Sequence, residues 1–211
     1  MLKVVLLANW GLGLELLKIL HLRDDIDIKL VITQYKKNIS DIWYNSVYTF
    51  ACEKGYKIVK QDSLSFYELQ KYIAELKVDL LVTHAFMKIL PKEIFSAPKY
   101  GSINIHPSLL PKHRGPSPTY WVLKNREKAT GLTCHYIDSG IDTGDIISQR
   151  KIIVEPHDTV SSIIEKQKLI IEELVEESIK RLQGRTFKPM VQKEELASYA
   201  PKPEKKEDFV S

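Results

Sequence analysis

The sequence predicts an α/β fold, with a mostly parallel, twisted sheet and helices on both of its faces. Apolar, partly β-branched runs at 2–8, 28–33 and 79–83 are typical of strands buried in a parallel sheet. Segments with apolar residues at helical spacing follow them, beginning with 14–22. Strand and helix patterns that alternate in this way favour parallel strands joined by helical crossovers.

The first strand is followed by a glycine turn and a helix, which is the order of a Rossmann-like unit. Gly11 and Gly13 stand in the turn, but the third glycine position of the dinucleotide fingerprint holds Leu16. The strand at 28–33 is also not followed by the acidic residue expected to bind a ribose. A nicotinamide cofactor is therefore not expected, although backbone N–H groups of such a turn could hold a phosphate.

The remaining elements follow from periodicity and capping. Ser65 and Glu68 form the pattern of a capping box, and Leu64 with Leu69 fits a hydrophobic staple. The predicted order is helix 47–53, strand 57–60, helix 66–76, strand 79–83, strand 102–105, helix 120–128, strands 130–137 and 146–154, and one long amphipathic helix at 161–182.

Composition is that of an ordinary globular domain. The chain has 211 residues, of which 44% are hydrophobic and 27% charged, and its net charge of +4 does not demand a nucleic-acid partner. Cys52 and Cys134 stand far apart, so a cytoplasmic location is expected, and the apolar start is too short for a membrane span. His113, His135 and His157 lack metal-ligand spacing, so no metal is expected.

A short strand pattern at 102–105 runs into a proline-rich stretch that carries two candidate catalytic residues. Asn104 and His106 are two residues apart, so their side chains leave an extended segment on the same side. An amide that donates a hydrogen bond and an imidazole that moves a proton suit attack on a carbonyl. The alternative is a structural histidine bonded to a backbone carbonyl.

A second segment, 137–147, supports the catalytic interpretation. Gly140 and Gly144 bracket Asp142 between two apolar runs. Glycines allow a tight turn or close approach of the backbone to a ligand, and a carboxylate there could orient a protonated histidine. A hairpin with acidic turn residues is the alternative explanation of this pattern.

Both motifs resemble one known family. The runs Asn-Ile-His-Pro-Ser-Leu-Leu-Pro-Lys-His-Arg-Gly-Pro at 104–116, Gly-Leu-Thr-Cys-His-Tyr-Ile-Asp at 131–138 and Ile-Asp-Thr-Gly-Asp-Ile-Ile at 141–147 resemble the N10-formyltetrahydrofolate-dependent formyltransferases. The resemblance covers most of residues 1–200 and implies the Rossmann-like formyltransferase fold. It places the family's catalytic asparagine, histidine and aspartate on Asn104, His106 and Asp142.

The resemblance also implies where the two substrates bind. N10-formyltetrahydrofolate would be the co-substrate, held by Phe86, Met87, Lys88, Ile89, Leu90, Ile137, Asp138 and Gly140. From their pattern alone, the apolar residues of 86–90 would sooner be assigned to the core. The residues expected to face the amine substrate are Trp10, Gly11, Gly13, Tyr35, Trp43, Tyr44, Pro107 and Arg114. Arg114 could instead tie a loop.

Three functions compete. The expected one is formyl transfer to the primary amine of a nucleotide-linked amino-deoxy sugar, such as a 4-amino-4,6-dideoxy sugar for surface glycan synthesis. It draws on the aromatic residues near Trp43 and on the short chain. The alternatives are a methionyl-tRNA formyltransferase-like enzyme and a non-catalytic folate- or nucleotide-binding module. The absence of a further domain and the low basicity argue against tRNA, so a nucleic-acid partner is not expected.

The predicted organisation is a catalytic domain at 1–190 and a short charged extension at 191–211. Its alanine-, serine- and tyrosine-containing stretch at 197–202 resembles the point where longer family members pass into a C-terminal domain. A homodimer is one expectation for such an enzyme. The sequence does not identify the nucleotide, the sugar, the position of the amine, the oligomeric state or the role of the extension.

Overall fold

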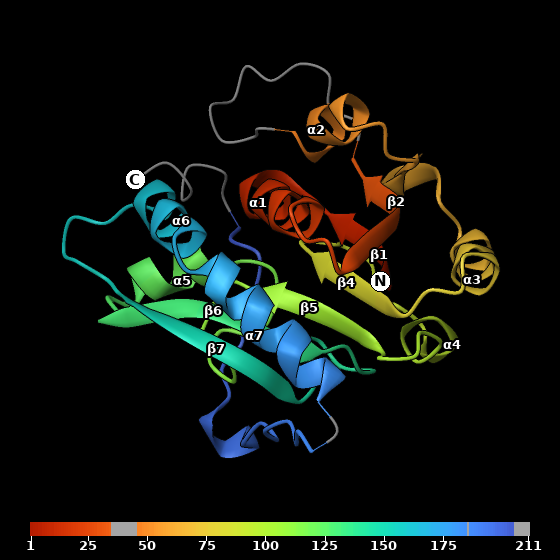
Figure 1. Cartoon of the computed structure of the whole chain (residues 1–211). Coiled ribbons are helices and arrows are strands. Elements are labelled where there is room, and N and C mark those ends of the chain that lie inside the picture. Colours follow the sequence, from red (N-terminus) through yellow and green to blue (C-terminus); the bar gives the residue numbers. More distant parts are fainter. Residues whose placement is uncertain (35–45, 185, 205–211) are drawn as a thin grey trace. The chain divides into compact units, whose positions relative to one another are not determined.

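The computed structural model describes residues 1–34, 46–184 and 186–204. Seven strands form a mixed sheet in the order β3-β2-β1-β4-β5-β6-β7, and the chain divides into two compact units, Met1–Asn104 and Ile105–Ser211. Figure 1 labels most of the helices and strands of both units. The predicted α/β fold, mostly parallel with helical crossovers, is confirmed.

The first unit is a parallel sheet with helical connections. Its elements are β1 (Leu2–Ala8), α1 (Trp10–His21), β2 (Ile26–Thr33), α2 (Val47–Glu53), β3 (Ile58–Lys60), the 3₁₀ turn η1 (Gln61–Ser63), α3 (Phe66–Glu75), β4 (Leu80–His84), α4 (Lys92–Phe95) and the start of β5 (Ser102–His106). β1 pairs with β2 on one side and β4 on the other, β3 pairs with β2, and β5 with β4. All these pairings are parallel, so the strands' carboxyl ends meet at one edge.

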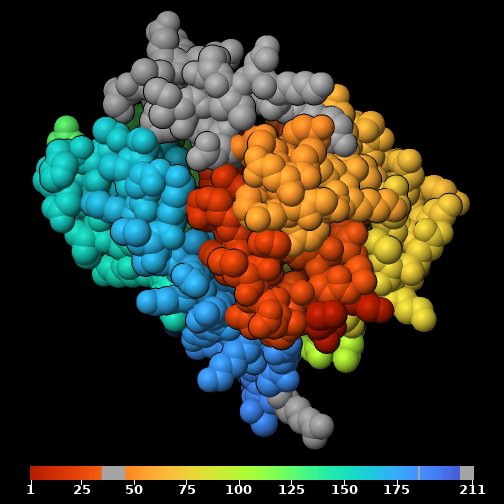
Figure 2. All heavy atoms as spheres, turned by 45° about the horizontal axis from the view of Figure 1, so that its top comes forward, coloured from red at the N-terminus to blue at the C-terminus, as the bar shows by residue number. Residues whose placement is uncertain are grey.

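Burial of this sheet follows from its continuous apolar strands. Every residue of β1 from Val4 to Ala8 is fully buried, as are Leu30–Ile32 in β2 and Leu80 and Leu81 in β4. Such runs are expected where both faces of a parallel sheet are covered. Helix α2 lies beside α1, as Figures 1 and 2 both show. A Cβ on Gly13 would lie 3.1 Å from that of Ala8, so this glycine lets α1 lie close to β1.

The second unit is built on an antiparallel pair. Its elements are the end of β5, α5 (Pro118–Lys124), β6 (Ala129–Tyr136), β7 (Ile146–Ile153), α6 (Val160–Lys168), α7 (Ile171–Gln183) and the 3₁₀ turn η2 (Glu194–Leu196). β6 and β7 pair from Ala129 opposite Ile153 to His135 opposite Ile146. Helix α7 packs against β7 and β6, and its buried side includes Leu174, Val175 and Ile179.

The segment after α7 is tied to the loops of the same unit. Met190 exchanges both backbone hydrogen bonds with Ile146. Further along, Arg114 and Tyr199 form a parallel bridge, in which the N–H of Arg114 donates to Ser198 and its carbonyl accepts from Ala200. Residues 190–201 therefore belong to the packed structure of this unit, although the sequence analysis places most of them in an extension. The domain division at residue 190 stays a prediction.

The last predicted helix is interrupted in the structure. The single helix expected at 161–182 is two helices, α6 and α7, and the chain between them leaves the helical path at Ile170, with φ −112° and ψ −6°. The side chain of Gln167 is fully buried and donates to the carbonyls of Pro107 and Gly131, which fixes the end of α6. No glycine or proline marks this break, so the amphipathic pattern runs through it.

The glycine turn predicted after β1 is also different. Helix α1 already begins at Trp10, so Gly11 and Gly13 lie inside its first turns. The change of direction falls on Trp10, whose φ is +64°. The helix predicted at 120–128 also differs, since it spans Pro118–Lys124 in the structure. It begins earlier because proline is well placed in a first turn. It ends earlier because Arg126, just beyond its end, has a φ of +52°.

The capping box predicted for α3 is confirmed. Ser65 Oγ accepts from the Glu68 N–H, and the Glu68 carboxylate accepts from the Ser65 N–H. We expect Ser65→Ala to lower the free energy of unfolding by about 1 kcal/mol in urea denaturation, because the Glu68 N–H loses its partner. Ser63→Ala is the control, since that hydroxyl donates to the Lys60 carbonyl and caps no helix. Equal effects of the two changes would contradict the assignment.

Candidate functional site

The carboxyl edge of the first unit's sheet is organised by one buried amide, that of Asn9. Its Nδ2 donates to Gln61 Oε1 at 2.7 Å and to the Ala85 carbonyl at 3.0 Å. Its Oδ1 accepts from Thr33 Oγ1 at 3.2 Å and from the Gln34 N–H at 2.9 Å. The ends of β1, β2 and β4 and the turn after β3 are thus joined through a single side chain. No sequence pattern singles out Asn9, because its partners are far away in the chain.

Two strained residues flank this amide. Trp10 and Ala85 both have φ in the left-handed region, at +64° and +53°. Such values are uncommon for residues other than glycine and are sustained by the surrounding structure. Trp10 is 40% exposed, so its indole offers an apolar surface at the edge of this unit.

The segment expected to bind folate, residues 86–90, follows β4. Met87 and Ile89 are 57% and 65% exposed, whereas Leu90 is buried in the core. Lys88 Nζ donates to the carbonyls of Gln61 and Leu64, which holds the segment against the turn η1. Two exposed apolar side chains on an anchored loop are compatible with binding a flat aromatic ligand. Phe86, between Ala85 and Met87, is half-buried.

Asn104 has a defined orientation at the end of the first unit. Its Oδ1 accepts a hydrogen bond from Thr83 Oγ1 at 2.9 Å, across the β4–β5 pairing. The oxygen end of the amide is therefore turned toward Thr83. The nitrogen end, which can only donate, is set in the other direction.

His106 ends β5 and is buried in the second unit. Its Nε2 lies 2.8 Å from the carbonyl oxygen of His113, which can only accept, so Nε2 carries a proton. The other ring nitrogen, Nδ1, lies 3.4 Å from Asp142 Oδ2. In a neutral ring Nδ1 is then the basic atom, and a proton taken up there would lie beside a carboxylate.

Asp142 lies between two imidazoles. His106 Nδ1 is 3.4 Å from its Oδ2, and His135 Nε2 is 3.4 Å from its Oδ1. The Gly115 N–H also donates to Oδ2 at 2.8 Å. Asp142 itself has a φ of +54°, so its backbone is held in the left-handed region. The structure thus brings together His106 and Asp142, which the resemblance assigns as catalytic.

His135 is a third member of this cluster that sequence reasoning missed. Its Nδ1 lies 2.8 Å from the Tyr136 carbonyl, so this nitrogen donates and Nε2 faces Asp142. In both imidazoles, therefore, one N–H donates to a backbone carbonyl and the other ring nitrogen faces the Asp142 carboxylate. Its place on β6 before the acidic loop is the signal that could have identified it. From the sequence, His135 is weighed only as a metal ligand, and its spacing argues against that role.

Burial and charge have opposite effects on the pKa of each of two groups in this cluster, His106 and Asp142. Burial lowers the pKa of His106, and the charge of Asp142 works against that effect. Burial alone would raise the pKa of Asp142, but the charge of His106 and the hydrogen bond and charge of His135 hold it well below its usual range. The carboxylate thus stays ionised, and the imidazole of His106 is placed to take up a proton beside it.

The loop that carries Asp142 is shaped by its own side chains. Asp138 Oδ1 accepts from the Gly140 N–H at 3.0 Å and from Thr143 Oγ1 at 2.6 Å. A Cβ on Gly140 would lie 2.0 Å from Thr143 Oγ1, and one on Gly144 would lie 1.9 Å from the Tyr136 carbonyl oxygen. These glycines therefore allow close packing inside the loop. Ile137, at its start, is half-buried.

Arg114 is tied to the C-terminal segment. Its Nε donates to Gln192 Oε1 at 3.1 Å, and its Nη1 donates to both carboxylate oxygens of Glu194 at 2.9 and 3.1 Å. The guanidinium is buried, so these contacts support the structural alternative for Arg114. Pro107 follows His106, and its carbonyl accepts from Gln167.

Tyr35, Trp43 and Tyr44, expected to face the amine substrate, lie outside the described residues. Within the described ranges, no group of three or more His, Cys, Asp and Glu side chains is arranged to hold a metal ion. No helix in the same ranges is both long and apolar enough to cross a membrane.

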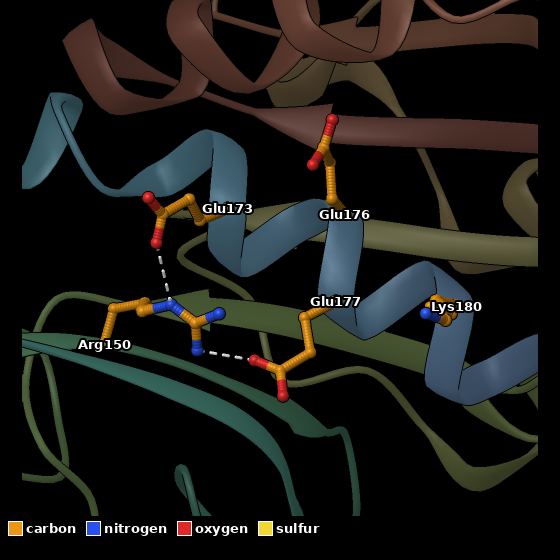
Figure 3. Close-up of a pocket in the computed structure, with 5 residues that line it drawn as sticks. All are labelled: Arg150, Glu173, Glu176, Glu177 and Lys180. Carbon is orange, nitrogen blue, oxygen red and sulfur yellow. Dashed lines mark hydrogen bonds and ion pairs between the residues drawn. The ribbon is translucent and has the colours of Figure 1, made fainter.

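A separate hollow on the second unit lies along α7 and β7, away from the predicted residues. Figure 3 shows Arg150 reaching from β7 to Glu173 and Glu177 of α7, with Glu176 and Lys180 on the same helix. Arg150 pairs there with both Glu173 and Glu177. The hollow is thus lined by surface ion pairs and holds none of the chemistry seen around Asp142.

Comparison with known proteins identifies the family. The formyl transferase family model matches residues 11–176. The methionyl-tRNA formyltransferase of Caldanaerobacter subterraneus subsp. tengcongensis is 37% identical over 179 residues, which are 83% of this chain and 58% of that protein. The chain therefore belongs to the formyl transferase family, and it spans about 58% of the length of that relative.

Solved structures agree with the fold. The phosphoribosylglycinamide formyltransferase of Anaplasma phagocytophilum has a TM-score of 0.71 and 28% identity, over 86% of this chain and 86% of that one. WlaRD, described as a sugar 3N-formyltransferase in the presence of dTDP and 5-N-formyl-THF, has a TM-score of 0.71 and 25% identity, over 95% and 70% of the two chains. The family resemblance seen in the sequence is confirmed, while its finer assignment to the sugar enzymes remains a prediction.

We expect Asp142→Asn to lower the pKa of His106 further, because the mutant lacks the negative charge that opposes the effect of burial. The measurement is the titration midpoint of the His106 ring in ¹H–¹⁵N NMR spectra. Glu165→Gln, which removes an exposed carboxylate elsewhere in the same unit, should leave the midpoint unchanged. A midpoint that stays constant or rises in Asp142→Asn would contradict the coupling.

Proposed function

We propose that the chain transfers a formyl group from N10-formyltetrahydrofolate to a primary amine. The observation that carries this proposal is the Asp142 carboxylate 3.4 Å from Nδ1 of His106, whose other ring nitrogen is bonded to the His113 carbonyl. Asn104 stands two residues before His106, a spacing that predicts side chains on the same side of an extended segment. Membership of the formyl transferase family supplies the reaction class.

In the proposed reaction the amine nitrogen attacks the formyl carbon and forms the new N–C bond. The carbonyl electrons move onto oxygen, and the Nδ2 of Asn104 donates a hydrogen bond to this oxyanion. The amine proton passes to Nδ1 of His106, where Asp142 stabilises the imidazolium. Collapse breaks the bond between carbon and N10, and the proton is delivered to N10. The products are the N-formyl amine and tetrahydrofolate.

The co-substrate would be bound by the segment 86–90 and by Ile137, Asp138 and Gly140. The exposed apolar side chains of Met87 and Ile89 support this assignment, since a pterin ring presents a flat aromatic face. Lys88 would contribute by anchoring the segment to the carbonyls of Gln61 and Leu64. Asp138 would contribute by fixing the conformation of its loop, where it accepts from the Gly140 N–H. Trp10, Gly11 and Gly13 remain proposed contacts of the amine substrate.

For the acceptor we propose the α-amine of methionyl-tRNA as the first candidate. Its support is that the curated relatives named methionyl-tRNA formyltransferase are 33% to 38% identical to this chain. This choice replaces the order expected from the sequence, where the nucleotide-linked amino sugar comes first. The amino sugar remains the second candidate, supported by the likeness to WlaRD at 25% identity.

We expect Asn104→Ala and His106→Ala to lower kcat by roughly 10²–10³, since each removes a group that acts only in the transition state. Tetrahydrofolate release from N10-formyltetrahydrofolate measures this loss. Asn125→Ala and His157→Ala are the controls, because both side chains are exposed in the same chain. A variant at 104 or 106 that kept more than about a tenth of wild-type kcat would lose its assigned role.

The acceptor is tested with the same assay, using methionyl-tRNA beside UDP-, dTDP- and GDP-linked amino-deoxy sugars. We expect turnover with methionyl-tRNA and none with the His106→Ala protein. Turnover with one nucleotide sugar alone would support the second candidate. Silence with every acceptor, while folate still raises the melting temperature, would favour the binding module over the enzyme.

A further inference from the structure

Gln192 is a buried residue of the C-terminal segment. It contacts the loop after β5, which carries Arg114, and the loop between β6 and β7, which carries Asp142. Its Nε2 donates to the carbonyl of Asp142 at 2.9 Å and to that of Gly144 at 2.7 Å. Its Oε1 accepts from Arg114 Nε at 3.1 Å. Both N–H groups and the carbonyl of this one amide are therefore in use, and the residue is only 9% exposed.

These contacts lie on both sides of the hydrogen bond between the Gly115 N–H and the Asp142 carboxylate. The Gly115 N–H donates to Asp142 Oδ2, and Gly115 directly follows Arg114 in the chain. Gln192 therefore contacts Asp142, whose carboxylate accepts this hydrogen bond, and Arg114, which directly precedes the donor Gly115. The carbonyls of 142 and 144 also enclose Thr143, so the amide fixes the backbone on both sides of that residue.

The backbone at Asp142 needs such a restraint. Its φ of +54° lies in the left-handed region, which aspartate adopts more readily than most residues with a Cβ but still uncommonly, and the direction of the carboxylate depends on it. If the carbonyl of Asp142 were released, the loop could relax, and Oδ1 and Oδ2 would leave the nitrogens of His135 and His106. A displacement of about 1 Å in such a group can cost around 10²-fold in rate.

We infer that Gln192 is a positioning residue, which fixes the carboxylate of Asp142 between His106 and His135. The inference rests on the proposed function, because positioning matters to turnover only if Asp142 supports formyl transfer. It gives the C-terminal segment a part in the active site, although the sequence analysis treats residues 191–211 as an extension.

The test compares Gln192→Met, Gln192→Glu and a matched control, Gln149→Met. Gln149 is a half-buried residue whose amide also donates twice, to the Leu110 carbonyl at 2.8 Å and to Thr133 Oγ1 at 2.9 Å, and neither partner is Asp142. Gln192→Glu keeps an acceptor for Arg114 and loses both donors. It therefore separates the contact with Arg114 from the hold on the Asp142 loop.

Three readouts are needed: kcat and KM for formyl transfer, the melting temperature, and the NMR titration midpoint of His106. We expect both Gln192 variants to lose at least about tenfold in kcat with KM within about twofold, and to shift the His106 midpoint. Gln149→Met should lower the melting temperature by a similar amount and leave kcat and the midpoint near wild type.

Gln192 variants with wild-type kcat and an unshifted His106 midpoint would overturn the inference, and so would a Gln149→Met protein with the same losses. If Gln192→Met does not fold, Gln192→Asn takes its place, since it keeps the amide but cannot reach both carbonyls. The NMR titration needs no substrate. If the wild-type protein transfers no formyl group, the proposed function fails while the titration still decides whether Gln192 holds Asp142.

Discussion

The position of the Asp142 carboxylate between two imidazoles is the arrangement on which the candidate site depends. His106 and His135 each donate one N–H to a backbone carbonyl and turn the other nitrogen to Asp142. The carboxylate remains ionised because their charges and the Gly115 N–H oppose the effect of burial. The cluster can therefore take up a proton at a defined atom, which is what attack of an amine on a formyl carbon requires.

Distant parts of the second unit maintain this position. The His113 carbonyl that fixes the His106 tautomer belongs to a residue with a φ of +60°, and its N–H donates to Ser198 Oγ. Gln192 in turn holds the strained backbone of Asp142. Strain of this kind persists where the surrounding structure determines it fully. The segment 190–201 supplies that support, so it is as much a part of the site as the loops that carry the histidine and aspartate.

Much of the fold could be predicted because burial and helix capping depend on residues that are close together in the sequence. The apolar strand at 2–8, the helix at 47–53 and the capping box at Ser65 match the structure closely. The break between α6 and α7 could not be predicted, since it depends on the long-range anchor of Gln167. Likewise His106 and Asp142 are predictable from a motif, and so is His135, which stands in the run 131–138. Asn9 and Gln192 are not, because they act through partners distant in sequence.

The most direct test of the account is the pH dependence of kcat/KM for formyl transfer, set beside the NMR titration of His106 in the same protein. His106 must be neutral to accept the proton of the amine, and burial lowers its pKa. We predict an acid limb in kcat/KM that follows the His106 titration and moves to lower pH with it in Asp142→Asn. A kcat/KM profile whose acid limb does not follow the His106 titration, or does not move with it in Asp142→Asn, would contradict proton transfer to His106.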